Sequence, residues 1–332
     1  MTKVLPRVAI STGDPAGIGP EIGLKCALDP AVNAICRPVI VGDPTVIELQ
    51  ARAAGLPRQF RVIAEMREAQ WPGAPNVLSA PMPGIEHFAF GSSGANYGLG
   101  ALASARRALK AALAGEVEAV VAAPQNETSI AAAGIAFDGY PSFVARETGT
   151  DVHDVFLMLC FGERRIVHTT LHVGVAQAVS LITRERVGRA IRATDTALRR
   201  IGIGAPRIVV SGLNPHAGEG GLFGREEIEI ISPAIADAKA EGIDVEGPYG
   251  ADTMFPKPCD AFVVMLHDQG HIPAKLLAPN QAAGLAIGVP VLFSSVAHGS
   301  AYDIAGKGVA SPAAMIEAIR RLVGAPAAAK AA

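Results

Sequence analysis

The sequence predicts an α/β fold with a largely parallel sheet. Short apolar runs alternate with longer segments whose apolar residues recur at helical spacing, and this alternation continues along most of the chain. Strands that alternate with helices are typical of a parallel sheet covered on its faces. No internal repeat or low-complexity linker divides the 332 residues. We therefore expect two closely joined domains rather than a string of separate ones.

The strands are predicted from short apolar runs, many of them rich in Val and Ile. In chain order the predicted strands are Arg7–Thr12, Pro38–Gly42, Ala119–Ala123, Arg165–Leu171, Arg207–Gly212 and Ala261–Leu266.

The helices are predicted from apolar residues that return every three or four positions. The predicted helix Arg184–Ile201 has Val187, Ile191, Leu198 and Ile201 on one stripe, with arginines on its other face. In the last helix we expect Ser311 as the N-cap and Pro312 at the first helical position, with a frayed tail at 324–332. The predicted helices are Gly100–Leu113, Arg184–Ile201, Glu226–Ala240 and Pro312–Val323.

Composition and charge exclude several classes of protein. The chain has 29 basic and 31 acidic residues and no basic block, which argues against nucleic-acid binding. It has no apolar run long enough to span a bilayer, and its first residues lack the apolar core of a signal peptide. Its four cysteines form no CxxC pair. We expect a soluble cytoplasmic protein with buried, reduced thiols and no membrane partner.

Three histidines, far apart in sequence, are the strongest candidates for a functional site. They are His172 in HTTLHVG, His216 in GLNPHAGEGG and His267 in MLHDQGH, each shortly after a predicted strand. Ligands of open α/β sheets bind beyond the carboxyl ends of the strands. Three imidazoles with an open fourth position are typical of a catalytic metal. Such ligands favour a late first-row ion, zinc above all, with Fe, Mn, Co and Mg as alternatives.

Other readings of these histidines remain open. A histidine near a strand end can serve only as a hydrogen-bonding group. His168, His271 and His298 compete for the same role. His168 precedes His172 by four residues, so on a strand the two side chains would share a face. His271 is a candidate for the group that orients a ligand.

Two glycine-rich segments are candidates for ligand loops. In NPHAGEGGLFGREE, glycines precede a helix expected to start near Arg225, so backbone N–H groups could cradle a phosphate. The alternative is a tight strand-to-helix loop. The second segment, STGDPAGIGPEI, does not have the GxGxxG spacing and so does not predict a Rossmann fingerprint. The glycines concerned are Gly218, Gly220 and Gly221 in the first segment, and Gly13, Gly17 and Gly19 in the second.

Three charged residues near the histidines are candidates for acid–base or binding roles. Asp252 in GADTMF and Asp268 beside His267 are suited to accept a proton or to orient a ligand. Their alternatives are helix capping for Asp252 and a structural hydrogen bond for Asp268. Lys275 is suited to neutralise a substrate carboxylate or phosphate, unless it is only a solvated lysine.

The motifs together resemble one family. GDPAGIGPE, GLNPHAGEGG, ADT, HDQG and AHGSAYDIAGKG are similar to segments of the 4-hydroxythreonine-4-phosphate dehydrogenase family of vitamin B6 biosynthesis, nearly end to end. The resemblance implies a two-domain α/β/α fold related to isocitrate and isopropylmalate dehydrogenases, with the active site in the interdomain cleft. It implies NAD as oxidant and a homodimer whose metal is held by three histidines contributed across the interface, matching His172, His216 and His267.

On this basis we expect a first domain at 1–125 plus 265–323 and a second at 126–264. The choice between NAD and NADP stays open, because no acidic residue that reads the ribose is identifiable. We assign cofactor binding to Asn214, Gly218, Glu219, Gly220, Asp268 and His298.

Departures from the family pattern concern the substrate pocket. A GHTEF-like segment reads GYPSF here, so Tyr140 and Pro141 replace a His-Thr pair. A family lysine is replaced by Glu127, and the family's substrate-binding asparagine and arginine fall on Gly284 and Phe293. Replacing arginine with phenylalanine removes a bidentate phosphate clamp. We therefore expect an unphosphorylated substrate, contacted by Asn126, Glu127, Tyr140, Lys275 and Phe293.

The chain resembles one branch of the family in particular. AGIAFxGYPS, VFLML, RIVHxTLH, MLHDQGHIPxKLLAPN and SSVxHGSAxDIAG are similar to segments of the terephthalate cis-dihydrodiol dehydrogenases. This implies oxidation of a carboxylated ring diol, with Asp252 as the base, followed by decarboxylation to an aromatic diol. The alternatives are 4-phosphohydroxy-L-threonine or a related phosphorylated hydroxy acid as substrate, or a non-catalytic binding protein.

Overall fold

The structure, a computed structural model, describes residues 4–278 and 282–324 and divides into two compact units. Unit 1 contains the described residues up to Thr148 and those from Pro290 onward, and unit 2 is Gly149–Val289. The chain passes between the units at 148/149 and 289/290, later than the domain boundaries we predicted at 125/126 and 264/265. Most of the predicted tail, 325–332, lies outside the described residues.

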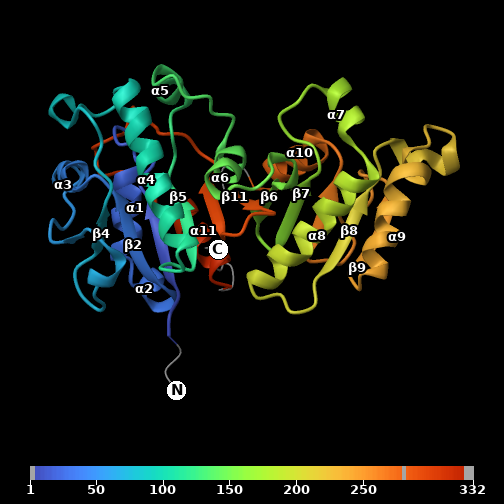
Figure 1. Cartoon of the computed structure of the whole chain (residues 1–332), viewed down its shortest axis with the longest axis horizontal. Coiled ribbons are helices and arrows are strands. Elements are labelled where there is room, and N and C mark those ends of the chain that lie inside the picture. The colour runs from blue at the N-terminus through green and yellow to red at the C-terminus, as the bar shows by residue number, and fades with distance from the viewer. Residues whose placement is uncertain (1–3, 279–281, 325–332) are drawn as a thin grey trace. The chain divides into compact units, whose positions relative to one another are not determined.

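Unit 1 contains a parallel sheet with strand order β3-β4-β2-β1-β5-β12. Figure 1 labels β2, β4 and β5 of this sheet. Its core includes Ile40 of β2 packed with Leu24 of α1 and Ile47 of α3. The strands are β1 Arg7–Ser11, β2 Arg37–Gly42, β3 Arg61–Ile63, β4 Asn76–Ser79, β5 Ala119–Ala122 and β12 Phe293–Val296. The helices are α1 Gly19–Leu28, α2 Pro30–Ile35, α3 Pro44–Ala53, α4 Ala95–Leu113, α5 Glu127–Ala132, α6 Tyr140–Thr148 and α11 Ala313–Leu322.

Unit 2 contains a mixed sheet with strand order β11-β6-β7-β10-β8-β9. β7, β10, β8 and β9 pair in parallel, whereas β6 is antiparallel to both β7 and β11. The predicted largely parallel α/β architecture is therefore confirmed. The strands are β6 Phe156–Phe161, β7 Arg164–His168, β8 Arg207–Ser211, β9 Asp244–Tyr249, β10 Ala261–Val264 and β11 Ala283–Ile287, and the helices are α7 Val175–Leu181, α8 Arg184–Arg200, α9 Ser232–Ala240 and α10 His267–Leu277.

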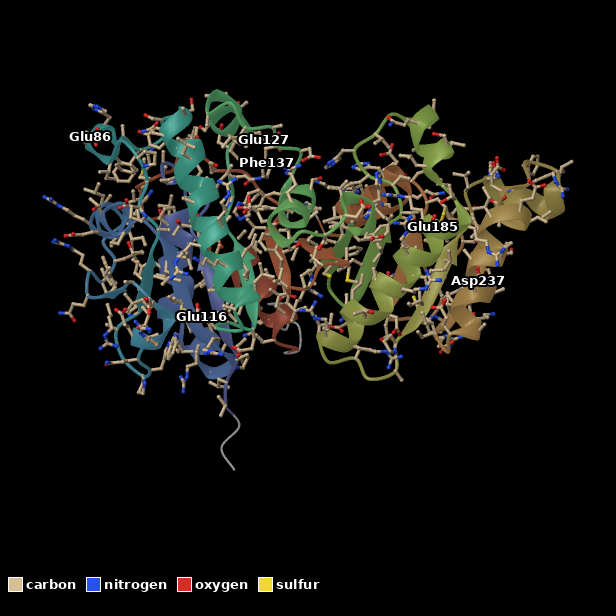
Figure 2. All side chains as sticks on the ribbon, viewed as in Figure 1. Glu86, Glu116, Glu127, Phe137, Glu185 and Asp237 are labelled. Atoms are coloured by element: carbon tan, nitrogen blue, oxygen red, sulfur yellow. The ribbon has the colours of Figure 1, made fainter. Side chains whose placement is uncertain are left out.

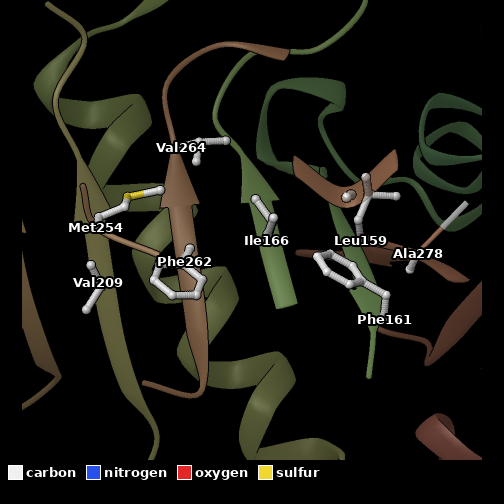
Figure 3. Close-up of a cluster of buried hydrophobic side chains, with 9 residues drawn as sticks. Leu159, Phe161, Ile166, Val209, Met254, Phe262, Val264 and Ala278 are labelled. Atoms are coloured by element: carbon white, nitrogen blue, oxygen red, sulfur yellow. The ribbon is translucent and has the colours of Figure 1, made fainter. Parts of the chain in front are cut away.

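The core of unit 2 fixes helix α10 against the sheet. Ala274 of α10, and Ala278 just after it, pack with side chains from β6, β7, β8 and β10, and Figure 3 shows this cluster. Because these contacts are buried and apolar, they stabilise the position of the whole helix. The other cluster members are Leu159, Phe161, Ile166, Val209, Met254, Phe262 and Val264.

Helix α8 shows the predicted amphipathic stripe. Val187, Ile191 and Leu198 are fully buried, whereas four arginines on the other face pair with acidic side chains, namely Arg184, Arg189, Arg192 and Arg199. Figure 2 shows Asp237 on α9, whose carboxylate accepts hydrogen bonds from Arg184 at 2.6 and 2.7 Å. The helix thus packs through one face and is solvated on the other, as the sequence predicted.

Several predicted boundaries are wrong for local reasons. Helix α4 begins at Ala95 rather than Gly100 and therefore includes Gly98. A Cβ at Gly98 would lie 2.3 Å from the Ser129 carbonyl oxygen, so this glycine serves close packing and does not mark the start of the helix. The predicted helix Glu226–Ala240 is a π-helical segment, Glu227–Ile231, followed by α9. Pro233 causes this break because it lacks the N–H that an α-helix needs.

At the last helix, α11 starts one residue later than predicted, with Pro312 as the N-cap. Ser311 still contributes, since its Oγ accepts a hydrogen bond from the Ala313 N–H at 3.4 Å. The strands β3, β4, β6, β9, β11 and β12 of the structure have no counterpart in our sequence prediction.

Two further expectations concern the whole chain. The four cysteines are thiols, and Cys26, Cys36 and Cys160 are buried. Within residues 4–278 and 282–324, none of the helices combines the length and apolar character that crossing a bilayer requires.

Candidate active site

The three predicted metal histidines follow three neighbouring parallel strands of unit 2. His172 lies beyond β7, His267 is the first residue of α10 just beyond β10, and His216 lies in the loop beyond β8. The carboxyl ends of these strands meet at one edge of the sheet, where α/β proteins bind ligands. β7 ends at His168, so His168 and His172 do not share a strand face as we had expected.

His172 and His267 lie close together and line the same two pockets. Their ring centroids are 5.8 Å apart and their planes meet at 45°. Both pockets also contain Asp268, and the second contains His271 and Lys275, with a volume of about 550 Å³. We call His172, His267, Asp268, His271 and Lys275 the helix cluster, because four of the five lie on α10.

The geometry of His172 and His267 fits shared binding of a divalent ion. An ion about 2.1 Å from a nitrogen of each ring brings two imidazole rings to roughly the separation seen here. The His267 Nδ1 is 2.7 Å from Asp268 Oδ1, so its Nε2 remains available. A carboxylate on the other ring nitrogen is the usual support of a metal-bound histidine.

The HDQG motif builds the start of α10. The Gln269 Oε1 accepts hydrogen bonds from the backbone N–H groups of Met265 and Leu266 at 2.9 and 3.0 Å, and its Nε2 donates to the Gly212 carbonyl at 3.1 Å. Gln269 thereby ties the end of β10 to the end of β8. At Gly270, a Cβ would lie 2.3 Å from His168 Nε2, so only glycine allows α10 to approach His168 this closely.

His168 and His271 form a hydrogen-bonded pair behind the pocket. The His271 Nδ1 lies 3.0 Å from His168 Nε2, and His168 Nδ1 lies 3.3 Å from the Leu157 carbonyl oxygen. Burial, and then the charge of His271, lowers the pKa of His168 to about 3. Partial burial and the nearby His267 lower the pKa of His271 to about 4. Both rings are therefore neutral at pH 7.

His216 stands apart from the helix cluster. Its side chain is 64% exposed, its Nδ1 lies 3.5 Å from Glu219 Oε2, and it lines neither of the two pockets. Asp252 is its neighbour: a Cβ on Gly250 would lie 2.8 Å from Asp252 Oδ1 and 3.7 Å from the His216 Cα. We call His216, Glu219 and Asp252 the loop cluster. Across the described part of the chain, no three His, Cys, Asp or Glu side chains can hold one ion together.

The backbone around His216 is left-handed over five consecutive residues. φ is 52° at both His216 and Ala217, and 43° at Glu219, values that non-glycine residues rarely adopt. The two remaining left-handed residues are Gly218 and Gly220. Such a loop persists only if its surroundings hold it.

Glu227 provides this support, and sequence reasoning missed it. It is 3% exposed, and its Oε1 accepts hydrogen bonds from the Leu213 and Asn214 N–H groups at 2.8 Å each. Its Oε2 accepts another from Asn214 Nδ2 at 3.0 Å. With Glu226 and Glu229 nearby, the N-terminus of this helical segment carries carboxylates, which does not favour the phosphate cradle we expected there.

Most of the substrate contacts that we expected in unit 1 have structural roles in the fold. Tyr140 and Phe293 do pack together, with ring centroids 5.1 Å apart, but Phe293 is only 1% exposed and Tyr140 donates to the Ala123 carbonyl. The apolar wall is therefore part of the core of unit 1. Asn126 caps α5 by accepting from the Ser129 N–H, whereas Glu127 is exposed, as Figure 2 shows.

The remaining predicted residues are placed as follows. His298 lies in unit 1, where its Nδ1 is 3.2 Å from the Gly299 carbonyl oxygen. Gly284 lies in β11 and pairs with Leu159. The GDPAGIGPE loop is buried, and there Asp14 accepts a hydrogen bond from the Tyr302 hydroxyl at 2.5 Å. Its glycines serve close packing, since a Cβ at Gly19 would lie 2.0 Å from the Thr12 carbonyl oxygen.

Comparison with known proteins identifies the relatives of this chain. The family model described as pyridoxal phosphate biosynthetic protein PdxA matches residues 34–322. A 1,2-dihydroxy-3,5-cyclohexadiene-1,4-dicarboxylate dehydrogenase from Comamonas sp. is 40% identical, with 97% of this chain and 98% of that protein covered. A D-threonate 4-phosphate dehydrogenase from Cupriavidus necator is 39% identical, with 97% of each chain covered.

A solved structure shows the same fold. The crystal structure of a terephthalate 1,2-cis-dihydrodiol dehydrogenase from Burkholderia xenovorans LB400 is 44% identical to this chain, with a TM-score of 0.76. The match covers 98% of this chain and 100% of that one.

Proposed function

The chain belongs to the PdxA family of dehydrogenases, and we propose that it is a metal-dependent, NAD-linked enzyme that oxidises and decarboxylates a carboxylated cis-dihydrodiol to an aromatic diol. The observation that carries this proposal is that His172, His267 and Lys275 line one pocket. The pocket thus places two side chains suited to bind a metal beside the positive charge of a lysine. Two relatives act by name on such a dihydrodiol, one of them 44% identical.

We propose that the metal site is shared between two copies of the chain. His172 and His267 are positioned for two ligands, whereas His216 stands apart in the same chain. In a symmetric dimer, His216 of a second copy supplies the third ligand. Because Asp252 lies beside His216, it accompanies that histidine and comes from the same copy.

The side chains then divide the work of the reaction. A divalent ion held by His172 and His267 would lower the pKa of the substrate hydroxyl, and NAD⁺ would supply the acceptor for the hydride of the carbon that bears this hydroxyl. Asp268 orients His267 through the 2.7 Å contact with Nδ1. Lys275 pairs with a ring carboxylate, and Asp252 accepts the hydroxyl proton.

The second half of the reaction follows from the substrate. Oxidation creates a ketone β to a carboxylate, so the bond between that carboxylate and the ring breaks and CO₂ leaves. The electron pair left behind enters the ring, which thereby becomes an aromatic phenolate, and a proton then returns to the oxygen. Stabilising the negative charge on that oxygen lowers the barrier.

The second candidate substrate is a phosphorylated hydroxy acid, because the relative from Cupriavidus necator acts by name on D-threonate 4-phosphate. The pocket of the helix cluster has one lysine, Lys275, among its lining residues. A phosphate dianion is usually held by bidentate arginines or several backbone N–H groups. One lysine suits a carboxylate better.

A substrate panel decides between the candidates. The zinc-loaded protein is incubated with NAD⁺ and either terephthalate cis-dihydrodiol, D-threonate 4-phosphate or 4-phosphohydroxy-L-threonine, and NADH and CO₂ are measured. We expect kcat/KM for the dihydrodiol to exceed that for the phosphates at least about 100-fold. Comparable turnover of a phosphorylated substrate contradicts the proposed substrate class, and no NADH from any of them supports a non-catalytic binding protein.

A further inference from the structure

The His168–His271 pair has a feature that the reaction above does not use. His168 is 1% exposed, so its hydrogen bonds must be made within the protein. Its Nδ1 faces the Leu157 carbonyl oxygen, which can only accept a hydrogen bond. The proton of the neutral His168 ring is therefore on Nδ1, and its Nε2 is an acceptor.

This assignment determines the state of His271 in turn. The 3.0 Å contact between His271 Nδ1 and His168 Nε2 holds one proton, and since His168 Nε2 accepts, His271 Nδ1 donates. A neutral His271 then has no proton on Nε2. The buried Leu157 carbonyl thus determines, through His168, that the Nε2 of His271 carries no proton.

His271 cannot use this nitrogen to share an ion with His267. The two rings are stacked, with centroids 3.8 Å apart and planes only 8° from parallel. A metal lies close to the plane of the imidazole that binds it, so an ion bound by His267 lies about 3 Å or more from the plane of His271. The stacking instead keeps the His267 ring in its orientation, while the free nitrogen of His271 is left for another partner.

That partner must be a hydrogen-bond donor in the pocket. His271 lines the pocket together with His172, His267 and Lys275, and its Nδ1 side is turned to buried His168. Its Nε2 is on the opposite side of the ring. A substrate that places one hydroxyl near His172 and His267 carries, if it is a vicinal diol, a second hydroxyl one carbon away. The spacing between the two hydroxyls of a vicinal diol is similar to the 3.8 Å between the stacked rings of His267 and His271, so the second hydroxyl matches the position of His271.

We propose that His271 is a specificity-determining residue whose Nε2 accepts a hydrogen bond from the hydroxyl next to the one that is oxidised, with its tautomer set by His168. The enzyme thereby selects vicinal diols over substrates with a single hydroxyl. The proposal rests on the proposed dehydrogenase function and applies to two of the three substrates in the panel, because terephthalate cis-dihydrodiol and D-threonate 4-phosphate are vicinal diols, whereas 4-phosphohydroxy-L-threonine has an amino group in place of the second hydroxyl.

Three substitutions separate the parts of this proposal. His271→Asn keeps a donor toward His168 but has no acceptor that reaches the pocket, whereas His271→Gln keeps an acceptor near the Nε2 position. His271→Leu has neither. For each variant, kcat/KM is measured with the diol that the wild type turns over and with its analogue lacking the second hydroxyl. We expect a preference of about tenfold for the diol in the wild type, its loss in the Asn and Leu variants, and its retention in the Gln variant.

Nuclear magnetic resonance of the zinc-loaded protein with ¹⁵N-labelled histidine tests the tautomer without turnover. We expect both His168 and His271 to be protonated on Nδ1 alone at pH 7, and the His271 Nε2 signal to shift when the diol binds but not when the single-hydroxyl analogue binds. A proton on His271 Nε2, or equal losses for diol and analogue in all three variants, overturns the proposal. The expected signals and shift without any NADH formation contradict the proposed function instead.

Discussion

The helix cluster and the loop cluster hold their histidines in opposite ways. His267 and His271 are mounted on a helix that packs into the core through Ala274 and Ala278, and Gln269 fixes its first turn. His216 is mounted on a left-handed loop whose shape depends on hydrogen bonds to buried Glu227. The helix cluster is thus supported by regular packing, and the loop cluster by one carboxylate.

This difference suggests different consequences of substitution. Apolar packing is spread over many contacts, so a single change weakens the helix cluster only gradually. Strained backbone relaxes as soon as the groups that hold it are removed. The loop cluster should therefore fail abruptly, and the following predictions are ordered by expected effect.

Glu227→Ala is expected to have the largest effect. It leaves the N–H groups of Leu213 and Asn214 without their acceptor, which we expect to lower the free energy of unfolding by about 3 kcal/mol. The loop then relaxes and His216 moves, so zinc affinity and activity are lost. Urea unfolding and zinc titration measure both, with Glu229→Ala, an exposed partner of Arg225, as control. Wild-type zinc affinity in Glu227→Ala contradicts the role of this carboxylate.

Asp268→Ala is expected to weaken metal binding while the fold stays intact. The His267 ring loses the carboxylate at 2.7 Å from its Nδ1, and loss of such a partner costs between about 10- and 100-fold in metal affinity. Competition with a chelator measures the change, and the KM for NAD⁺ is measured in parallel. A raised KM for NAD⁺ with unchanged zinc affinity supports our alternative assignment of Asp268 to cofactor binding.

Gly270→Ala is expected to disturb the helix cluster through packing alone. The new methyl group meets His168 Nε2 and forces α10 away from β7, at a cost of about 2 kcal/mol in unfolding free energy. Gly204→Ala is the matched control, because no atom lies within 4 Å of a Cβ at that position. Equal unfolding free energies of the two variants are incompatible with close approach of α10 to His168.

The stability of the metal-free protein is expected to fall in mild acid because of His168. Its pKa is lowered to about 3, from 6.5, so the unfolded chain binds more protons between these values and stability rises with pH there. From pH 7 to about pH 5.5, this histidine alone accounts for a loss of about 1.3 kcal/mol. Urea unfolding at both pH values measures it. A His168→Gln variant with the same pH dependence as the wild type contradicts this assignment.

The sequence predicted the helix cluster better than the loop cluster. Strand-end histidines and the HDQG motif are local signals, and the predicted ends of β7, β8 and β10 were within a few residues of those in the structure. The loop depends on Glu227, which is eleven residues from His216 and whose burial no local pattern reveals. The close pair of His168 and His271 likewise results from packing between β7 and α10. RIVH contains the first residue and HDQGH the second, but the contact between them is not a local signal.

Other failures have the same origin. Phe293 was expected to face a ligand, but its side chain is buried and packs against Tyr140. Antiparallel β6 and β11 were missed because continuous apolar runs do not distinguish strand from helix. Sequence patterns therefore predicted candidates for the residues that carry chemistry, whereas burial decides what each of them faces.

Complementation between inactive variants tests the central claim, that the two clusters of different copies form one site. His172→Ala and His216→Ala proteins are unfolded and refolded together so that subunits mix, and dihydrodiol-dependent NADH formation is measured. Random pairing gives hybrid dimers with one intact site, so we predict recovery of about a quarter of wild-type activity. Asp252→Asn should be rescued by His172→Ala but not by His216→Ala. No recovery in mixtures whose hybrid dimers are verified by mass spectrometry contradicts the shared site.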